Sequence, residues 1–282
     1  MSEAAPLGDH RVSEVLLEAL PYLQRYANKT IVVKMGGSTF GRHDTTLDDL
    51  VALQRLGVNT VVVHGGGNEI TGWMHRLGLK AQFVDGLRVT DGEAMQLALM
   101  VLAGKVNKEL VAQIAQRGGR AVGLCGVDGQ ILQARRKDER LGYVGEVVRV
   151  DLTALTDLEK AGFIPIMAPI AIGDDFQALN VNGDTAAAAV ATALNAEKLI
   201  FLTDVPGVMR GNGEVISQLT AEEASDLMGT DVISGGMIPK IRACVNALDK
   251  VERAHIIDGR QEHALIYELF TDSGVGTMLT KS

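Results

Sequence analysis

Short apolar runs that end in glycine recur along the chain and predict buried strands of a parallel sheet. Two of them, Thr30–Val33 and Val61–Val63, are rich in β-branched residues and lack polar alternation, which is typical of buried strands. The first run is followed by Lys34 and two glycines, and the second by His64 and three glycines. Because roughly thirty residues separate the two runs, they have the spacing of a β-α-β unit.

Helical periodicity fills most of the chain between such runs. A first helix is expected over Val12–Ala27, with a kink at Pro21 because proline removes one backbone hydrogen bond. Further helices are expected at Thr45–Leu56, Glu69–Leu77, Asp91–Arg117 (broken near Gly104), Leu152–Ala161, from Asp184, from the capping box Thr220–Glu223, and from Pro239 to Val251. Further extended segments are expected on either side of Gly86 and at Ala121–Leu124, Ile131–Leu132, Tyr143–Val150 (exposed), Ile164–Ala171, Lys198–Thr203 and Arg253–Ile257.

Composition narrows the class of protein. The 282 residues are 46% hydrophobic, which is enough for one large domain or for two lobes that share a sheet. The net charge of −8 and the scattered basic residues argue against nucleic acid as a partner. Cys125 and Cys244 are far apart in the sequence, so we expect neither a disulfide framework nor a zinc site, and a cytoplasmic location. We also expect no signal peptide and no membrane span.

The glycine runs at the strand ends are candidates for anion binding. In an open parallel sheet, ligands gather at the carboxyl ends of the strands, where Lys34 would project an ammonium. Gly36, Gly37 and the run Gly65–Gly67 would let backbone N–H groups approach a phosphate closely. Neither a Walker A motif nor G-x-G-x-x-G is present, so a bound phosphate would need another cradle. The alternative is a solvated Lys34 before a simple glycine turn.

Three further charged residues stand in unusual positions. Arg88, between apolar Leu87 and Val89, is either a carboxylate clamp or an edge-strand residue that faces water. Asp184 opens an alanine-rich helix just after two asparagines, and its simplest role there is that of an N-cap. Lys240 lies in the first turn of a helix, where the dipole disfavours a cation unless an anion is bound.

Taken in order, six motifs resemble those of the amino-acid kinase family. They are Lys34–Gly37, His64–Gly67, Gly86–Thr90, Asn180–Asp184, Leu202–Val205 and Gly235–Lys240. Each is weak alone, but the ordered set is specific. The resemblance implies an α/β fold, namely a three-layer αβα sandwich around a central, mostly parallel sheet. It further implies an N-terminal oligomerisation helix (1–28), an acyl-substrate lobe (29–195) and a nucleotide lobe (196–282).

The resemblance also implies a reaction and its residues. It is strongest to members that use ATP, accompanied by Mg²⁺, to phosphorylate the γ-carboxylate of N-acetyl-L-glutamate in arginine biosynthesis. Lys34 and Lys240 would then flank the transferring phosphoryl, and Asp184 would hold both lysines. The implied acyl-substrate residues are Gly66, Gly67, Arg88 and Asn180, with no protein metal ligand. The implied phosphate and nucleotide residues are Gly36, Gly37, Thr203, Asp204, Val205, Gly207, Gly235, Gly236 and Met237.

Two stretches near the C-terminus, 254–260 and 268–276, are similar to those of arginine-sensitive members. That similarity implies inhibition by L-arginine, a homo-hexamer built as a trimer of dimers, and an effector site formed by Lys198, Ser217, His255, Glu268 and Gly274. The alternative is a core histidine and a solvated glutamate.

Two other functions stay open. One is a kinase for an acylated aminoadipate in lysine biosynthesis, and the other is a non-catalytic arginine sensor on the same fold. The intact Lys34, Asp184 and Lys240 argue against the sensor.

Overall fold

An eight-stranded sheet organises the computed structural model, which describes residues 9–36, 45–230, 232–271 and 274–282. The strand order is β12-β14-β13-β11-β1-β2-β8-β5, and every neighbouring pair is parallel except β13 and β14. The strands are β1 (Thr30–Met35), β2 (Asn59–His64), β5 (Ala121–Cys125), β8 (Ile164–Ala168), β11 (Lys198–Thr203), β12 (Gln218–Thr220), β13 (Arg253–Asp258) and β14 (Thr277–Thr280). The predicted, mostly parallel sheet is therefore confirmed.

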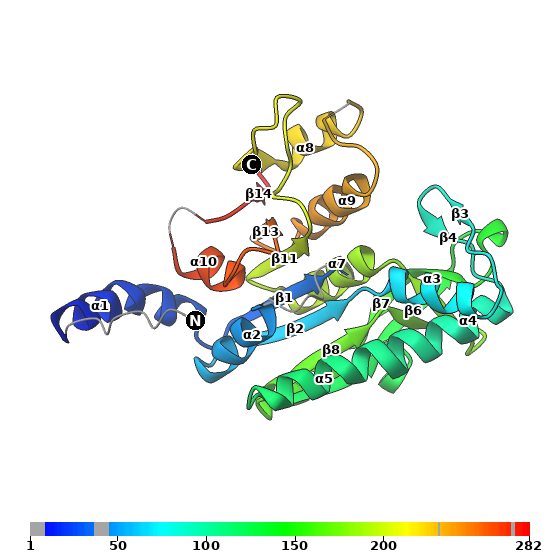
Figure 1. Cartoon of the computed structure of the whole chain (residues 1–282), viewed down its shortest axis with the longest axis horizontal. Helices are drawn as coiled ribbons and strands as arrows, with labels where there is room; N and C mark the ends of the chain where they lie inside the picture. Colours follow the sequence, from blue (N-terminus) through cyan, green and yellow to red (C-terminus); the bar gives the residue numbers. More distant parts are fainter. Residues whose placement is uncertain (1–8, 37–44, 231, 272–273) are drawn as a thin grey trace.

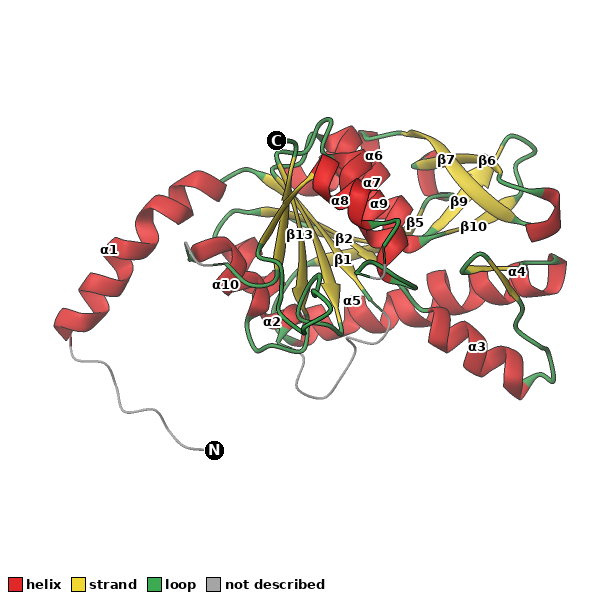
Figure 2. Ribbon diagram, turned by 90° about the horizontal axis from the view of Figure 1, so that it is seen from above, coloured by secondary structure: helices red, strands yellow, loops and turns green. Residues whose placement is uncertain are grey.

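Helices cover both faces of this sheet, as Figure 2 shows from above. One face carries α2 (Thr46–Arg55), α5 (Asn107–Gln116) and α10 (Ala264–Phe270), and α3 (Gly67–Arg76) and α4 (Gly92–Leu99) extend this layer. The other carries α6 (Thr153–Lys160), α7 (Gly183–Leu194), α8 (Ala221–Leu227) and α9 (Met237–Ala247). Successive residues of β1 point to opposite faces, so Val32 packs in one apolar core while Ile31 and Val33 pack in the other. The predicted three-layer sandwich is confirmed.

A small closed barrel is an addition that the sequence did not predict. It consists of β6 (Leu132–Arg136), β7 (Val144–Val150), β9 (Ile170–Gly173) and β10 (Ala178–Val181), with short 3₁₀ turns at Asp128–Gln130 and Glu139–Leu141. The expected single run Ile164–Ala171 divides at Pro169 into β8 of the main sheet and β9 of the barrel. Pro169 has no N–H to donate at this change of sheets, and its carbonyl oxygen accepts from the Val181 N–H of the barrel (3.0 Å). Nearby, β3 (Phe83–Val84) and β4 (Leu87–Arg88) form the expected pair around Gly86.

The long helical region after Asp91 contains a π-helix. Here α4 continues into the π-helical segment η1 (Met100–Val106) and then into α5, which accounts for the irregularity predicted at Gly104. Outside the barrel, the short elements α10, β12 and β14 were not predicted.

The N-terminal helix α1 (Asp9–Tyr26) runs through Pro21 as one element and projects away from the sheet beside α10 (Figures 1 and 2). The Tyr26 ring packs edge-on against Phe270 of α10 at a centroid distance of 6.1 Å. Several apolar side chains of α1 face solvent, among them Val15, Leu17 and Leu20. In the described ranges, no helix is both long and apolar enough to cross a membrane.

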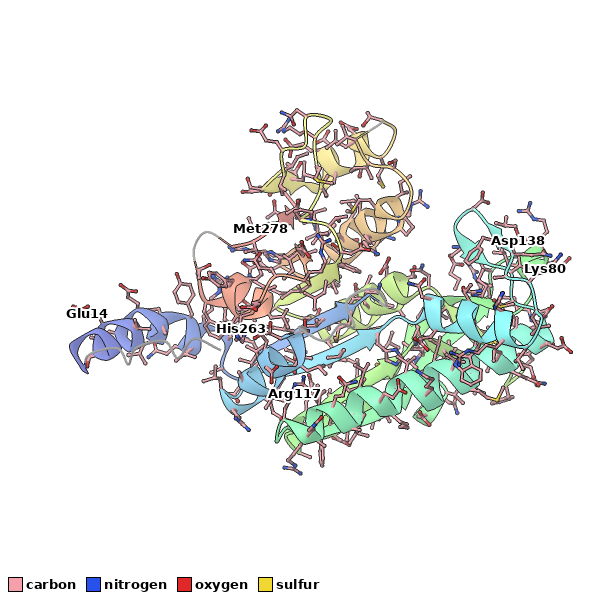
Figure 3. All side chains as sticks on the ribbon, viewed as in Figure 1. Glu14, Lys80, Arg117, Asp138, His263 and Met278 are labelled. Carbon is pink, nitrogen blue, oxygen red and sulfur yellow. The ribbon has the colours of Figure 1, made fainter. Side chains whose placement is uncertain are left out.

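His263, labelled in Figure 3, joins α10 to α2. Its backbone N–H donates to Thr45 Oγ1 (2.6 Å), and its Nδ1 donates to Asp49 Oδ1 (2.6 Å). Asp49 is buried, so this contact anchors the start of α10 on the neighbouring helix.

Candidate active site

Three charged side chains meet at the carboxyl edge of the sheet, in a cluster that we call the crevice. Lys34 is the fifth of six residues in β1, Asp184 is the second residue of α7, and Lys240 is the fourth of α9. Lys34 Nζ lies 2.7 Å from Asp184 Oδ1, and Lys240 Nζ lies 3.0 Å from Asp184 Oδ2. The structure thus brings together the three residues predicted as catalytic, from three distant parts of the chain.

Asp184 is available for this role because another residue caps its helix. Asn182 Oδ1 accepts hydrogen bonds from the backbone N–H groups of Asp184 (2.9 Å) and Thr185 (3.1 Å). The simple interpretation of Asp184 as the N-cap is therefore wrong. Its carboxylate, two residues after the cap, is left to pair with the lysines.

The crevice has a net positive charge in a poorly solvated place. Burial lowers the pKa of Lys34 and Lys240 lowers it further, against the raising effect of Asp184. Burial alone would raise the pKa of Asp184, but the two lysines outweigh it and lower that pKa. Two ammonium groups that share one carboxylate leave one positive charge unbalanced, which favours a bound anion.

A glycine turn closes the crevice beside Lys34. Gly66 has φ +156°, and a Cβ there would come within 2.5 Å of Leu102 Cδ2, so the position requires glycine. The Gly65 N–H donates to Met35 O (2.8 Å), which ties the turn to the end of β1. The Gly36 N–H donates to Leu202 O at 3.3 Å and continues the ladder. Gly37, also predicted to bind phosphate, lies outside the described residues.

Arg88 points into a pocket of about 150 Å³, which we call the Arg88 pocket. It is only 8% exposed, so the interpretation as a solvated edge residue is wrong. Nη2 donates to Gly67 O (2.9 Å) and Thr71 Oγ1 (2.8 Å), and Nη1 donates to Met74 Sδ (3.3 Å). The guanidinium has five N–H groups, so two remain for a ligand. Burial lowers the pKa of Arg88.

Gly67 and Asn180 also line the Arg88 pocket, together with Phe83, whose ring lies 4.8 Å from the guanidinium carbon. The Asn180 side chain donates to Thr90 Oγ1 (3.2 Å). Thr71 and Met74, which hold Arg88 in place, were not identified from the sequence. Their spacing from Gly67 on α3 is the only signal that could have found them.

A larger pocket of about 550 Å³, the Thr203 pocket, opens on the other side of Lys240. Most of the predicted nucleotide residues line it, namely Thr203, Asp204, Val205, Gly207, Gly236 and Met237. Gly235, the residue before Gly236, does not line the pocket. Gly207 has φ +153°, and a Cβ there would come within 2.7 Å of Thr277 Oγ1, so glycine is required.

A separate cavity of about 300 Å³, the α1 cavity, contains all five residues predicted to bind an effector: Lys198, Ser217, His255, Glu268 and Gly274. Tyr22, Arg25 and Tyr26 of α1 form one wall and were not named from the sequence.

Glu268 is the centre of the α1 cavity. It accepts from His255 Nδ1 (2.8 Å), Lys198 Nζ (3.1 Å) and the Val275 N–H (3.0 Å). Burial alone would raise the pKa of Glu268, but these partners lower it to about 2. Glu268 is buried, so the alternative of a solvated glutamate is wrong. His255 Nε2 is also buried and has no partner among the described residues.

Known proteins are similar in sequence to this chain over nearly its whole length. An acetylglutamate kinase of Thermosynechococcus vestitus (strain NIES-2133 / IAM M-273 / BP-1) is 49% identical over 284 residues, which cover 98% of this chain and 96% of that protein. An acetylglutamate kinase of Clostridioides difficile (strain 630) is 48% identical over 277 residues, which cover 95% of this chain and 97% of that protein.

Solved structures show the same fold. N-acetylglutamate synthase from Neisseria gonorrhoeae, complexed with coenzyme A and N-acetyl-glutamate, has a TM-score of 0.85 at 30% identity and covers 96% of this chain, which spans 63% of that protein. The structure of the same synthase complexed with coenzyme A and L-arginine has a TM-score of 0.79 at 27% identity. It covers 96% of this chain, which spans 65% of that protein. The sequence profile described as "Amino acid kinase family" matches residues 29–258, and the chain therefore belongs to the amino acid kinase family.

Proposed function

We propose that the chain transfers the γ-phosphoryl group of ATP to the γ-carboxylate of N-acetyl-L-glutamate, as the names of its relatives indicate for those proteins. The observation that carries this proposal is the crevice, in which two lysines share one buried carboxylate. The Arg88 pocket supplies a cation for an acidic substrate, and the Thr203 pocket supplies room for a nucleotide. We assign the first pocket to an acyl-substrate lobe (29–195) and the second to a nucleotide lobe (196–282).

In this mechanism an oxygen of the substrate carboxylate attacks the γ-phosphorus, and the bond to the β–γ bridging oxygen breaks to release ADP. The acceptor is already ionised, so no general base is needed, and catalysis consists of alignment and charge neutralisation. Lys34 and Lys240 would stabilise the negative charge on the transferring group, and Asp184 would hold both ammonium groups in place. The Gly66 N–H would donate to a phosphoryl oxygen.

The substrate would be bound at both of its acidic ends. The two remaining N–H groups of Arg88 suit the α-carboxylate, with Asn180 beside it. Magnesium would enter with ATP, bound mainly by phosphate oxygens and water. A reaction that consumes ATP also fits the cytoplasmic location expected from the cysteines.

A coupled assay of ADP release with N-acetyl-L-glutamate and N-acetyl-L-aminoadipate tests the substrate. Hydroxylamine should trap the acyl phosphate product as a hydroxamate. We expect a higher kcat/KM for the glutamate derivative, although one methylene separates homologues by only about 1–3 kcal/mol. If the aminoadipate derivative is preferred, the proposed substrate is wrong and the proposed type of reaction stands. Absence of hydroxamate with both acids would overturn the kinase proposal in favour of a sensor.

We also propose that L-arginine occupies the α1 cavity and inhibits the enzyme. The carboxylate of Glu268 suits a guanidinium, and Lys198 suits the ligand's carboxylate. A related solved structure, the synthase named above, was obtained with L-arginine. The exposed apolar side chains of α1 suit assembly into a homo-hexamer. Allostery requires arginine to bind one geometry of the hexameric ring better than another.

A further inference from the structure

Behind the glycine turn, a buried polar chain runs from Asn107 through His64 to the carbonyl oxygen of Gly65. Both side chains are completely buried. Asn107 Nδ2 lies 3.2 Å from His64 Nε2, and His64 Nδ1 lies 2.7 Å from Gly65 O. The mechanism above uses neither side chain.

The partners determine the tautomer of His64. A carbonyl oxygen can only accept, so Nδ1 carries the proton and donates it to Gly65 O. In the neutral ring, Nε2 is then an acceptor, and it accepts from the Asn107 amide. Burial lowers the pKa of His64 to about 4, against the raising effect of the bond to Gly65, and Lys108 and Lys34 act in the same direction as burial. The ring is therefore neutral near pH 7.

The neighbours of Asn107 determine the orientation of its amide. The two hydrogens of Nδ2 also face the carbonyl oxygens of Ile166 (2.8 Å) and Leu124 (3.2 Å), so one of them is shared between two acceptors, and Oδ1 accepts from Lys108 Nζ (3.0 Å). Turning the amide over would place its oxygen against two carbonyl oxygens and the lone pair of Nε2. The amide can therefore only donate to His64, which keeps the proton on Nδ1.

The hydrogen bond from His64 orients the Gly65–Gly66 peptide. In a trans peptide, the C=O and N–H point in opposite directions. A carbonyl held toward His64 therefore turns the Gly66 N–H away from the ring. The Gly66 carbonyl itself accepts from the Ile70 N–H (3.0 Å), and among the described residues no group accepts from the Gly66 N–H. This N–H is the donor assigned to the transferring phosphoryl.

We propose that Asn107 is a positioning residue for phosphoryl transfer, which acts through His64 to hold the Gly66 N–H toward the transferring group. The proposal rests on the kinase function proposed above. The π-helix η1 contributes to the placement, because Leu102 and Val106 on it pack against Gly66 and Asn107 follows immediately. π-Helical turns occur frequently at functional sites.

Steady-state kinetics of the full chain with ATP and N-acetyl-L-glutamate test this role. We expect Asn107→Ala to lower kcat by about 10- to 100-fold, the size expected for a small misplacement of a reacting group. The KM for ATP should change by less than about threefold, because the Thr203 pocket is untouched. Ile114→Val, two turns further along α5 and also buried, is the matched control for a weakened helix.

Two substitutions of His64 separate orientation from packing. In His64→Asn the amide nitrogen can take the place of Nδ1 and donate to Gly65 O. In His64→Gln the amide extends toward the place of Nε2 and loses that bond. We expect His64→Asn to retain at least tenfold more kcat than His64→Gln. In the His64→Asn background, Asn107→Ala should cost less than about threefold, because no ring remains to be oriented.

Nitrogen-15 NMR of the His64 ring provides a readout that does not depend on turnover. The wild type should keep the Nδ1–H tautomer from pH 8 to 5, and Asn107→Ala should populate the other tautomer. Three results would overturn the inference: a kcat of Asn107→Ala within threefold of Ile114→Val, equal rates for the two His64 variants, or an unchanged tautomer in Asn107→Ala. An inactive wild type would instead overturn the kinase function and, with it, the role in transfer.

Discussion

The crevice and the α1 cavity are built alike, since each centres on one buried carboxylate with two basic partners, yet they differ in charge. Asp184 in the crevice is paired with two lysines. Glu268 in the cavity is paired with Lys198 and with His255, whose pKa is lowered by burial, so that its ring is neutral near pH 7. Asp184 and its two lysines therefore sum to one positive charge, whereas Glu268 and Lys198 at the centre of the cavity balance each other. The two arginines that also line the cavity, Arg25 and Arg253, pair with Glu197 and Glu252.

This difference indicates the class of ligand that each site suits. An excess of positive charge suits a polyphosphate, whose own charge completes the balance. A balanced site suits a ligand without a large net charge, such as an amino acid. The two sites lie at opposite ends of β11: Lys198 is its first residue, and Lys34 pairs with Phe201 near its end. The five steps between the six residues of β11, at about 3.3 Å each, separate its ends by roughly 16 Å.

The largest effect should come from removing one cation of the crevice. We expect Lys34→Ala or Lys240→Ala to lower kcat by about 10²- to 10³-fold, the cost of losing one preorganised donor. Circular dichroism should show that the fold survives. Turnover within tenfold of the wild type in either variant would show that the excess charge is not catalytic.

The next effect concerns the Arg88 pocket. We expect Arg88→Lys to raise the KM for N-acetyl-L-glutamate about 10- to 100-fold, because an ammonium cannot reproduce the planar donors of the guanidinium. The KM for ATP should change much less. Equal changes in the two KM values would argue against a carboxylate clamp.

Removing α1 should affect only the α1 cavity and the assembly. Deletion of residues 1–27 removes Tyr22, Arg25 and Tyr26 from the cavity wall. We expect dimers on light scattering that retain turnover but are insensitive to millimolar arginine. A full-length chain that is itself a dimer and is not inhibited would refute the regulatory proposal and leave the kinase proposal intact.

The smallest effect is on stability in acid. The pKa of Glu268 is lowered to about 2 from an ordinary 4.5, so its ionic contacts stabilise the fold above pH 4.5 and lose that effect as the pH falls toward 2. We expect Glu268→Gln to lower Tm by on the order of 10 °C at pH 7, because Lys198 loses its partner. This gap should narrow below pH 4.5. A gap that is constant with pH would mean that packing, rather than charge, sets the effect.

Much of the fold could be predicted because the sequence of each central strand is by itself typical of a buried strand. The apolar runs of β1, β2 and β11 leave no plausible alternative to buried strands. Of the barrel strands, β7 was predicted as an extended segment, but β6, β9 and β10 have only four or five residues each, and their pairing defines the barrel rather than their own pattern. Helix α10 has seven residues and starts at His263, whose contacts with Thr45 and Asp49 come from a helix more than two hundred residues earlier. No local signal encodes such an anchor.

The residues of the candidate site likewise divide into those that a local motif predicts and those that only the structure identifies. Lys34, Asp184 and Lys240 stand in recognisable motifs, and the structure brings them together. Asn107 could not be identified, because an asparagine between valine and lysine in a helix is normally a surface residue. Only its complete burial and its contacts with strand carbonyls distinguish it.

Because α1 has exposed apolar residues, we expect the order of the α1 cavity to depend on the concentration of the protein. A helix of 18 residues that packs mainly on α10 is marginal by itself in water. If contacts with a second copy cover Val15, Leu17 and Leu20, subunit association and the order of the cavity wall are linked by mass action. The arginine concentration that gives half-inhibition should then rise as the enzyme is diluted, so that the abundance of the enzyme sets its own sensitivity to the inhibitor.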